Sequence, residues 1–160
     1  MKKHIRVGIG FDVHRFAPKR KLFLGGIQIK HKYGLLGHSD ADVILHAAGD
    51  AVLGALGLPD IGIHFPDTDK TLKDISSKLI IKKILHLLKS AGMRLVNLDC
   101  VIIAQSPRIS PYRNKMLKSM SSIFGTKCIN VKATTNEGIG FIGKNKGIAC
   151  ISAALLESQK

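Results

Sequence analysis

The chain has 160 residues, 45% of them hydrophobic, and a formal net charge of +14 at pH 7. Its length predicts one folded domain, residues 1–160, and its hydrophobic content excludes a disordered chain. The excess of Lys and Arg is compatible with a nucleic-acid partner. However, the basic residues are scattered along the chain, only 5% of the residues are aromatic and none is Trp. We therefore expect no nucleic acid as a partner. No apolar run approaches the roughly 18 residues that span a bilayer and no signal-like segment opens the chain, so we expect a cytoplasmic protein with no membrane partner.

The periodicity of the first half of the chain predicts a strand, a hairpin and two helices. In chain order these elements span residues 5–13, 21–29, 39–57 and 70–91. Two adjacent glycines, Gly25 and Gly26, supply the turn of the hairpin. Ser39 is the predicted N-cap of the first helix, and Gly57 and Gly92 are the predicted ends of the two helices.

The second half predicts strands around a third helix. The elements are a strand at 95–106, a helix from Ser110-Pro111 to Gly125, a strand at 129–135, a glycine-rich loop at 136–147 and a strand at 148–158. The end of the last segment is also compatible with a helix. This order of elements predicts an α/β sandwich, a mixed β-sheet with helices packed on one face.

The three cysteines of the chain are far apart in sequence. Cys100, Cys128 and Cys150 lie in apolar, strand-like surroundings and form no CxxC pair. They are therefore predicted to be buried, inert thiols.

Two polar side chains of the first strand point the same way. Asp12 and His14 are two residues apart, so they lie on one face of the strand. In the apolar helix at 39–57, Asp42, His46 and Asp50 recur every four residues and form one stripe. That stripe faces either solvent or a site. If it faces a site, Asp12, His14 and His46 form a set of one carboxylate and two imidazoles, which is typical of a catalytic zinc with one open position.

Other features of the sequence indicate phosphate binding. His38 and Ser39 precede a predicted helix N-terminus, where free N–H groups favour anions. Thr134, Thr135 and Glu137 come just before glycine-rich turns, although ordinary strand threonines and a loop carboxylate explain them equally well. The chain has neither a phosphate-binding P-loop motif nor the nucleophile elbow of the α/β-hydrolases.

Several long blocks of the chain resemble one enzyme family. The blocks are "GIGFDVHRF", "LGGIQI", "GLLGHSDADVILHAAGDAVLGALGLPDIGIHFPDTD", "IIAQSPRISPY" and "INVKATTNEGIGFIGKNKGIAC". In this order they resemble the 2-C-methyl-D-erythritol 2,4-cyclodiphosphate synthases, from Arg6 to Leu156. The resemblance implies a phosphorus–oxygen lyase of non-mevalonate isoprenoid biosynthesis. It also implies a homotrimer whose sheets face the three-fold axis and whose active sites lie between subunits.

The reaction that the resemblance implies is an internal ring closure. In 4-diphosphocytidyl-2-C-methyl-D-erythritol 2-phosphate, the 2-phosphate attacks the β-phosphorus of the same molecule, closes a cyclic diphosphate and expels CMP. In-line attack of one phosphate on another needs no protein nucleophile, so positioning and metal charge carry the catalysis.

The resemblance also implies roles for individual residues. Zn²⁺ or another divalent cation would be held by Asp12, His14 and His46, and Mg²⁺ or Mn²⁺ by the substrate diphosphate and Glu137. The implied catalytic residues are His38, Thr135 and Glu137. The implied substrate contacts are Asp12, His14, His38, Ser39, Asp60, Ile61, Gly62, Phe65, Pro66, Asp67, Ala104, Gln105, Ser106, Pro107, Arg108, Ile109, Thr134, Thr135, Asn136, Glu137, Phe141 and Lys144. Those at 104–109 and 134–135 would come from the neighbouring subunit.

The chain departs from the family pattern at two places. Arg108 stands where many members have Lys, and Lys144 and Lys146 stand where members often carry Arg and Glu around the central cavity of the trimer. A ring of lysines repels itself, so we expect an anion at the three-fold axis, such as an isoprenoid diphosphate. Two other functions stay open at this point: a zinc phosphohydrolase that uses the same site, and a basic scaffold that binds nucleic acid.

Overall fold

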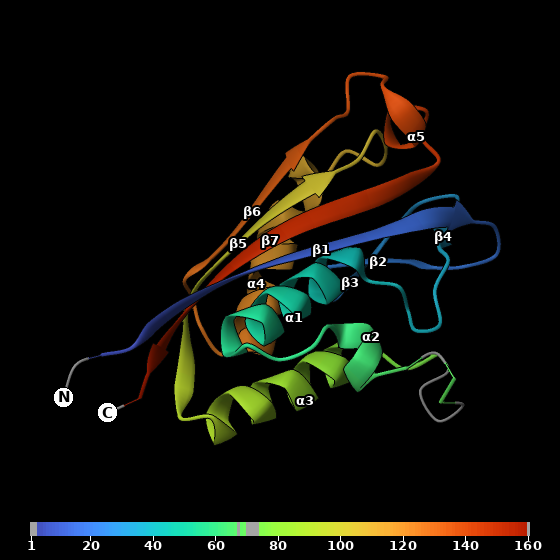
Figure 1. Cartoon of the computed structure of the whole chain (residues 1–160). Helices are drawn as coiled ribbons and strands as arrows, with labels where there is room; N and C mark the ends of the chain where they lie inside the picture. The colour runs from blue at the N-terminus through green and yellow to red at the C-terminus, as the bar shows by residue number, and fades with distance from the viewer. Residues whose placement is uncertain (1–2, 67, 70–73, 160) are drawn as a thin grey trace.

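A computed structural model describes residues 3–66, 68–69 and 74–159 (Figure 1). The strands are β1 (Ile5–Ala17), β2 (Leu22–Leu24), β3 (Ile27–Ile29), β4 (Gly34–Leu35), β5 (Met93–Ile103), β6 (Ile129–Thr134) and β7 (Gly147–Ser158). The helices are α1 (Val43–Leu56), α2 (Ile61–His64), α3 (Ser77–Ser90), the 3₁₀ turn η2 (Ser110–Tyr112), α4 (Arg113–Phe124) and α5 (Gly140–Gly143). The predicted hairpin is β2–β3. The segment 148–158, whose end was also compatible with a helix, is a strand throughout.

Five strands form the main sheet, in the order β4-β1-β7-β5-β6. β5 and β6 run parallel, whereas β1, β7 and β5 pair antiparallel and β4 pairs antiparallel with β1. The sheet is therefore mixed, as predicted. The buried apolar side chains form one core between the sheet and the helices. The helices α1, α3 and α4 lie on one side of the sheet (Figure 1).

The first helix begins later than the sequence predicts. It starts at Val43, and its N-cap is Asp42, whose side chain accepts hydrogen bonds from the backbone N–H groups of Ile44 and Leu45. The prediction of Ser39 as N-cap is wrong, because the carboxylate of Asp42 satisfies these free N–H groups. The end at Gly57 is confirmed, with φ of 73°. The second predicted helix, 70–91, is α3, which begins at Ser77 with Ser76 as its cap; residues 74–76 are not helical, and residues 70–73 lie outside the described residues.

Two glycines let α1 lie directly against β1. A Cβ atom added to Gly10 would lie 2.0 Å from the carbonyl oxygen of Ala47, and one added to Gly8 would lie 2.0 Å from that of Ala51. The backbones of strand and helix are thus closer than any side chain would allow. This close approach places His46 of α1 over the end of β1 that carries Asp12 and His14.

The opposite face of β1 is apolar and exposed. Ile5, Val7, Ile9 and Phe11 alternate with the glycines, and 73% of the surface of Ile9 is exposed. On the neighbouring strand β7, Ile151 is exposed on the same face. A contiguous apolar face of this kind marks an interaction surface rather than an ordinary solvated one.

The cysteine prediction holds for two of the three thiols. Cys100 and Cys150 are buried, whereas Cys128 is exposed just before β6. In the segment predicted as a glycine-rich loop, the structure adds the single-turn helix α5. Among the described residues, no helix combines the length and the apolar character needed to cross a membrane.

Candidate active site

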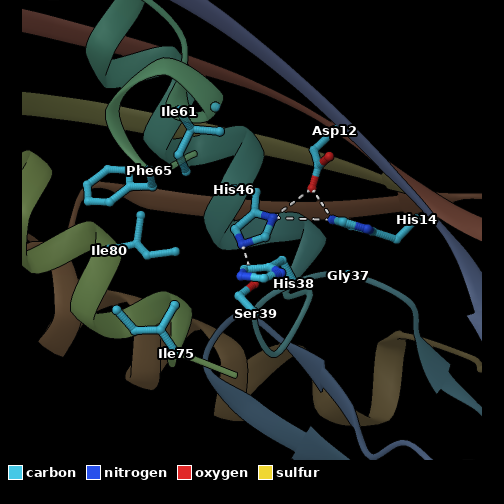
Figure 2. Close-up of a pocket in the computed structure, with 11 residues that line it drawn as sticks. Asp12, His14, Gly37, His38, Ser39, His46, Ile61, Phe65, Ile75 and Ile80 are labelled. Carbon is cyan, nitrogen blue, oxygen red and sulfur yellow. Dashed lines mark hydrogen bonds and ion pairs between the residues drawn. The ribbon is translucent and has the colours of Figure 1, made fainter. Parts of the chain in front are cut away.

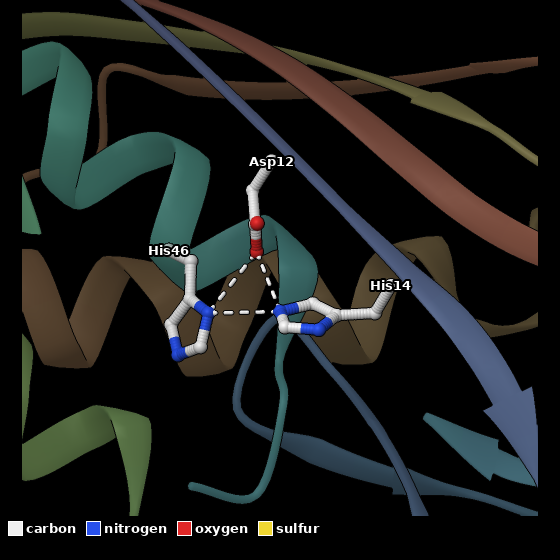
Figure 3. Close-up of side chains that lie close together, drawn as sticks. All are labelled: Asp12, His14 and His46. Carbon is white, nitrogen blue, oxygen red and sulfur yellow. Dashed lines mark hydrogen bonds and ion pairs between the residues drawn. The ribbon is translucent and has the colours of Figure 1, made fainter. Parts of the chain in front are cut away.

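Asp12, His14 and His46 converge on one point between β1 and α1 (Figure 3). The Oδ2 atom of Asp12 lies 2.9 Å from Nε2 of His14 and 3.0 Å from Nδ1 of His46, and the two imidazole nitrogens are 3.2 Å apart. All three side chains are mostly shielded from solvent, with 13–22% of their surface exposed. One oxygen and two nitrogens facing each other in this way can bind a divalent cation.

The other nitrogen of each imidazole has a partner of its own. Nδ1 of His14 lies 2.7 Å from the carbonyl oxygen of Leu36, and Nε2 of His46 lies 2.9 Å from Oγ of Ser77 and 3.1 Å from Oγ of Ser39. The carbonyl oxygen can only accept, so Nδ1 of His14 carries a proton. Nε2 of His14 then donates to Asp12 when the ring is protonated and offers a lone pair to a metal ion when the ring is neutral. Metal-binding histidines are held in this way, so the donor set fits a divalent ion.

The pKa values of the two groups on β1 are shifted in opposite directions. Burial would raise the pKa of Asp12, but the hydrogen bonds and positive charge of His14 and His46 lower it overall, below its ordinary range. Burial would lower the pKa of His14, but the hydrogen bond and negative charge of Asp12 raise it overall above 6.5. Without a metal ion, the contact with Asp12 thus favours the protonated form of His14.

Proton competition at His14 predicts how metal binding depends on pH. Nε2 must lose its proton to bind an ion, so the apparent affinity for zinc should fall by up to about tenfold per pH unit as the pH drops through the raised pKa of His14. In the metal-free protein, protonation of His14 stabilises the fold below pH 6.5, and this stabilisation is lost as the pH rises through the raised pKa. Zinc titrations and thermal unfolding between pH 5.5 and 8.5 measure both effects. An affinity that does not change over this range would contradict them.

The three side chains lie at one end of a pocket of about 200 Å³ (Figure 2). Of the residues predicted to bind substrate, the pocket is lined by Asp12, His14, His38, Ser39, Ile61, Gly62 and Phe65. The Nε2 atom of His38 is buried there, and no described residue forms a hydrogen bond with it. A buried polar atom of this kind is available to bind a ligand. Pockets for drug-sized molecules measure roughly 300–1,000 Å³, so this one accommodates part of a nucleotide-sized substrate.

Two further predicted residues, Asp60 and Pro66, do not line this pocket. Asp60 caps α2, where its side chain accepts from the N–H groups of Gly62, at 2.8 Å, and of Ile63. Pro66 is exposed beyond α2, and Asp67 lies outside the described residues. The role of Asp60 as a cap is compatible with a substrate contact but does not require one.

A second group of predicted residues lies at the other edge of the sheet. Residues 104–109 follow β5 and residues 135–137 follow β6, and since these strands are parallel neighbours, both segments leave the sheet at the same end. Ala104 N–H donates to the carbonyl oxygen of Thr134 at 3.0 Å, and the hydroxyl of Thr135 donates to Glu137 at 2.6 Å. We call residues 104–109 and 134–137 the β5–β6 rim. Phe141, in α5, and Lys144, its C-cap, are exposed.

Asp12, His14 and His46 lie apart from the β5–β6 rim within one chain. Three strand spacings separate β1 from β6, or roughly 14 Å at about 4.8 Å each, and no rim residue lines the pocket. The structure therefore builds two separate halves of the predicted site.

Asp50 and Ser77 also shape the pocket, and the sequence assigned a site role to neither. Oδ1 of Asp50 accepts from the N–H of Ile61 at 2.8 Å and so holds the start of α2 at the pocket. Burial is the main cause that raises the pKa of Asp50. The stripe of polar residues at every fourth position of α1 indicated Asp50, whereas Ser77 reaches His46 from a different helix and left no such signal.

Comparison with known proteins identifies a family. The sequence model described as the YgbB family matches residues 5–157. A protein of Syntrophomonas wolfei named 2-C-methyl-D-erythritol 2,4-cyclodiphosphate synthase is 48% identical over 96% of this chain and 99% of its own length. A protein of Halothermothrix orenii with the same name is 49% identical over 98% of this chain and 96% of its own length.

Solved structures share the fold as well. The CDP complex of IspF from Plasmodium falciparum superposes with a TM-score of 0.86 at 33% identity and covers all of both chains. The bifunctional IspDF from Campylobacter jejuni superposes with a TM-score of 0.93 at 40% identity, covering 98% of this chain and 43% of its own.

Proposed function

Because the chain belongs to the YgbB family, to which it matches over residues 5–157, and is a 2-C-methyl-D-erythritol 2,4-cyclodiphosphate synthase like its curated relatives, we propose that Asp12, His14 and His46 form the metal centre of its active site. The enzyme converts 4-diphosphocytidyl-2-C-methyl-D-erythritol 2-phosphate to the cyclic diphosphate and CMP. The observation that carries the proposal is the convergence of one carboxylate oxygen and two imidazole nitrogens beside a pocket.

The proposed division of labour follows from the two halves of the site. Asp12, His14 and His46 hold a zinc ion, and Glu137 with the substrate diphosphate holds Mg²⁺ or Mn²⁺. When bound, these ions would supply the positive charge that offsets repulsion between the two phosphates. An oxygen of the 2-phosphate forms the new bond to the β-phosphorus, and the bond from the β-phosphorus to CMP breaks with its electrons leaving on CMP.

The protein's own groups orient the reacting phosphates. His38 and Ser39 contact phosphate from the turn before α1, and Ile61, Gly62 and Phe65 enclose the methylerythritol. The β5–β6 rim holds the nucleotide, with the backbone of residues 104–109 against cytosine and Thr134 and Thr135 against phosphate. The remaining proposed substrate contacts are Asn136, which belongs to the rim, and Phe141 and Lys144, in α5 and at its C-cap. The bound CDP in a structurally similar protein supports a cytidine nucleotide as ligand.

A homotrimer would bring the two halves together. One chain separates the metal centre from the β5–β6 rim by roughly 14 Å of sheet, and a neighbouring copy would supply the missing rim. The exposed apolar face of β1 supports this assembly, since Ile5, Val7, Ile9 and Phe11 need a covering surface. Cyclic symmetry would place these faces around a three-fold axis.

An anionic ligand on that axis is the second part of the assembly proposal. Lys144 and Lys146 are exposed at the start of β7. Three copies of each would concentrate positive charge around the axis, which an anion such as an isoprenoid diphosphate would offset.

Mixing two inactive variants tests whether neighbouring chains share the site. His46→Ala removes a metal ligand and Glu137→Ala removes the rim carboxylate, so each pure trimer should be inactive. In a random 1:1 mixture of subunits, a site that takes His46 from one chain and Glu137 from the next is intact about one time in four. Co-refolded mixtures should therefore recover about a quarter of wild-type CMP release. Mixtures as inactive as either variant alone would show that one chain builds the whole site.

A further inference from the structure

The outer edge of the His46 ring faces a small buried polar cluster. Its Nε2 atom lies 2.9 Å from Oγ of Ser77, which is fully buried, and 3.1 Å from Oγ of Ser39. The hydroxyl of Ser77 contacts Oδ1 of Asp40, and the N–H of Ser77 donates to Oδ2 of Asp40 at 3.0 Å. Asp40, Ser77 and His46 thus form a chain of hydrogen bonds that ends at a proposed metal ligand.

The chemistry of the groups sets the direction of each hydrogen bond. A carboxylate can only accept, so the single proton of the Ser77 hydroxyl points to Asp40. The lone pairs of Oγ then face His46, and Nε2 of His46 must carry a proton to donate to them. When the His46 ring is neutral, its Nδ1 atom, 3.0 Å from Oδ2 of Asp12, therefore has a lone pair available for a metal ion.

We infer that Asp40, acting through Ser77, is a positioning residue that selects the Nε2–H tautomer of His46 and so makes Nδ1 the metal-binding atom. This inference rests on the proposed function of Asp12, His14 and His46 as a metal centre. Groups that orient a metal-binding histidine typically change metal affinity or activity by 10–100-fold when they are removed.

Ser39 does not set the tautomer by itself. Its Oγ accepts from the N–H of Ala41 at 3.1 Å, but no carboxylate of the described residues is bonded to its hydroxyl to fix where the proton points. Ser77 differs because both its hydroxyl and its N–H are bound to Asp40.

The backbone holds this arrangement in place across two segments that are distant in sequence. The N–H of Asp74 donates to the carbonyl oxygen of His38 at 2.7 Å, and the N–H of Asp40 donates to that of Ile75 at 3.1 Å. The turn before α1 and the start of α3 are thereby tied together. The hydroxyl of Ser77 reaches His46 because of this connection.

Variants at the two positions should change metal affinity in a characteristic pattern. Ser77→Ala removes the acceptor and should weaken zinc binding about 10–100-fold. Asp40→Asn cannot accept from both the hydroxyl and the N–H of Ser77, so its amide should donate to Oγ, turn the Ser77 proton towards His46 and weaken zinc binding as well. The double variant should bind zinc no more weakly than Ser77→Ala, because Asp40 acts through Ser77.

Competition for zinc between the full-length protein and a chelator measures the zinc affinity of each variant. The absorption spectrum of the cobalt-loaded protein and the thermal unfolding of the metal-free protein are measured alongside it. Ser76→Ala is the matched control, because Ser76 is the adjacent N-cap hydroxyl and its bond goes to the N–H of Lys78. It should leave zinc affinity and the cobalt spectrum unchanged. Ser77→Thr, which keeps the hydroxyl, should restore both relative to Ser77→Ala.

Two results would overturn the inference. One is a Ser77→Ala protein that binds zinc as tightly as wild type with the same cobalt spectrum. The other is additive losses in the double variant, which would mean that Asp40 acts independently of Ser77. A wild-type protein that fails to bind zinc would instead refute the metal centre itself, and the inference with it.

Discussion

A His46→Ala variant is expected to lose its bound zinc and to release CMP about a thousandfold more slowly than wild type. Among the described residues, His46 supplies one of the three side-chain atoms that converge on the proposed metal position. The remaining pair, Asp12 and His14, can form an ion pair with each other in the absence of metal. The charge of a bound ion contributes several kcal/mol to transition-state stabilisation, and each 1.36 kcal/mol is a tenfold change in rate. Zinc content and CMP release, measured on the same sample, give the result.

His86→Ala is the matched control for this prediction. His86 is an exposed histidine of α3 outside the pocket, so its removal should leave zinc content and rate unchanged. If the His46→Ala protein retains a full complement of zinc and its activity, His46 is not a metal ligand.

An Asp42→Ala variant should lower the free energy of unfolding by roughly 4 kcal/mol, because each buried donor left unsatisfied costs about 1–3 kcal/mol. The Asp42 side chain is fully buried and accepts from four backbone N–H groups, those of Gly25, Gly26, Ile44 and Leu45. It ties the β2–β3 turn to the N-terminus of α1. For a chain of this size the loss corresponds to a fall of the melting temperature on the order of 10 °C.

Two further variants separate the hydrogen bonds of Asp42 from its charge. Asp42→Asn keeps the shape and one acceptor oxygen, so it should cost less than alanine but more than a surface change. Asp99→Ala removes a half-exposed carboxylate that pairs with Lys132 and should cost less than about 1 kcal/mol. Calorimetry at one fixed protein concentration compares the three. A melting temperature for Asp42→Ala within 2 °C of wild type would contradict the role of Asp42.

Local sequence patterns were sufficient to predict most of the fold. Alternation marked β1 and β6, and glycines marked the β2–β3 turn and the ends of α1 and α4. The start of α1 was misplaced because Ser39 and Asp42 are both good caps by residue type. The β2–β3 turn decides between the two caps, because the N–H groups of Gly25 and Gly26 in this turn donate to the carboxylate of Asp42.

The convergence of Asp12, His14 and His46, the proposed metal centre, was predictable because two independent periodicities place these residues together. Asp12 and His14 share a face of a strand, and His46 belongs to a polar stripe of an otherwise apolar helix. The same stripe was misleading for Asp42, which points into the core and not towards the pocket. Its burial depends on contacts with the hairpin, which the period of a single helix cannot show.

The contribution of Ser77 could not be predicted from the sequence. It reaches His46 from the first turn of α3, 31 positions away along the chain, through a hydrogen bond that only the packing of α3 against the turn before α1 creates. The assignment of the β5–β6 rim to the same active site likewise came from the family resemblance. One chain keeps the rim and the metal centre apart, so no spacing within the sequence relates them.

The most direct test of this account is to follow the cytidyl substrate by ³¹P NMR with the wild-type enzyme, with and without a chelator. The account predicts one cyclic diphosphate and one CMP for each substrate consumed, and loss of the reaction when chelator removes the metal, with recovery when zinc and magnesium are restored. Release of inorganic phosphate instead of the cyclic product would show that water, and not the 2-phosphate, is the nucleophile. Cyclisation that continues unchanged in the chelated enzyme would contradict the role assigned to Asp12, His14 and His46.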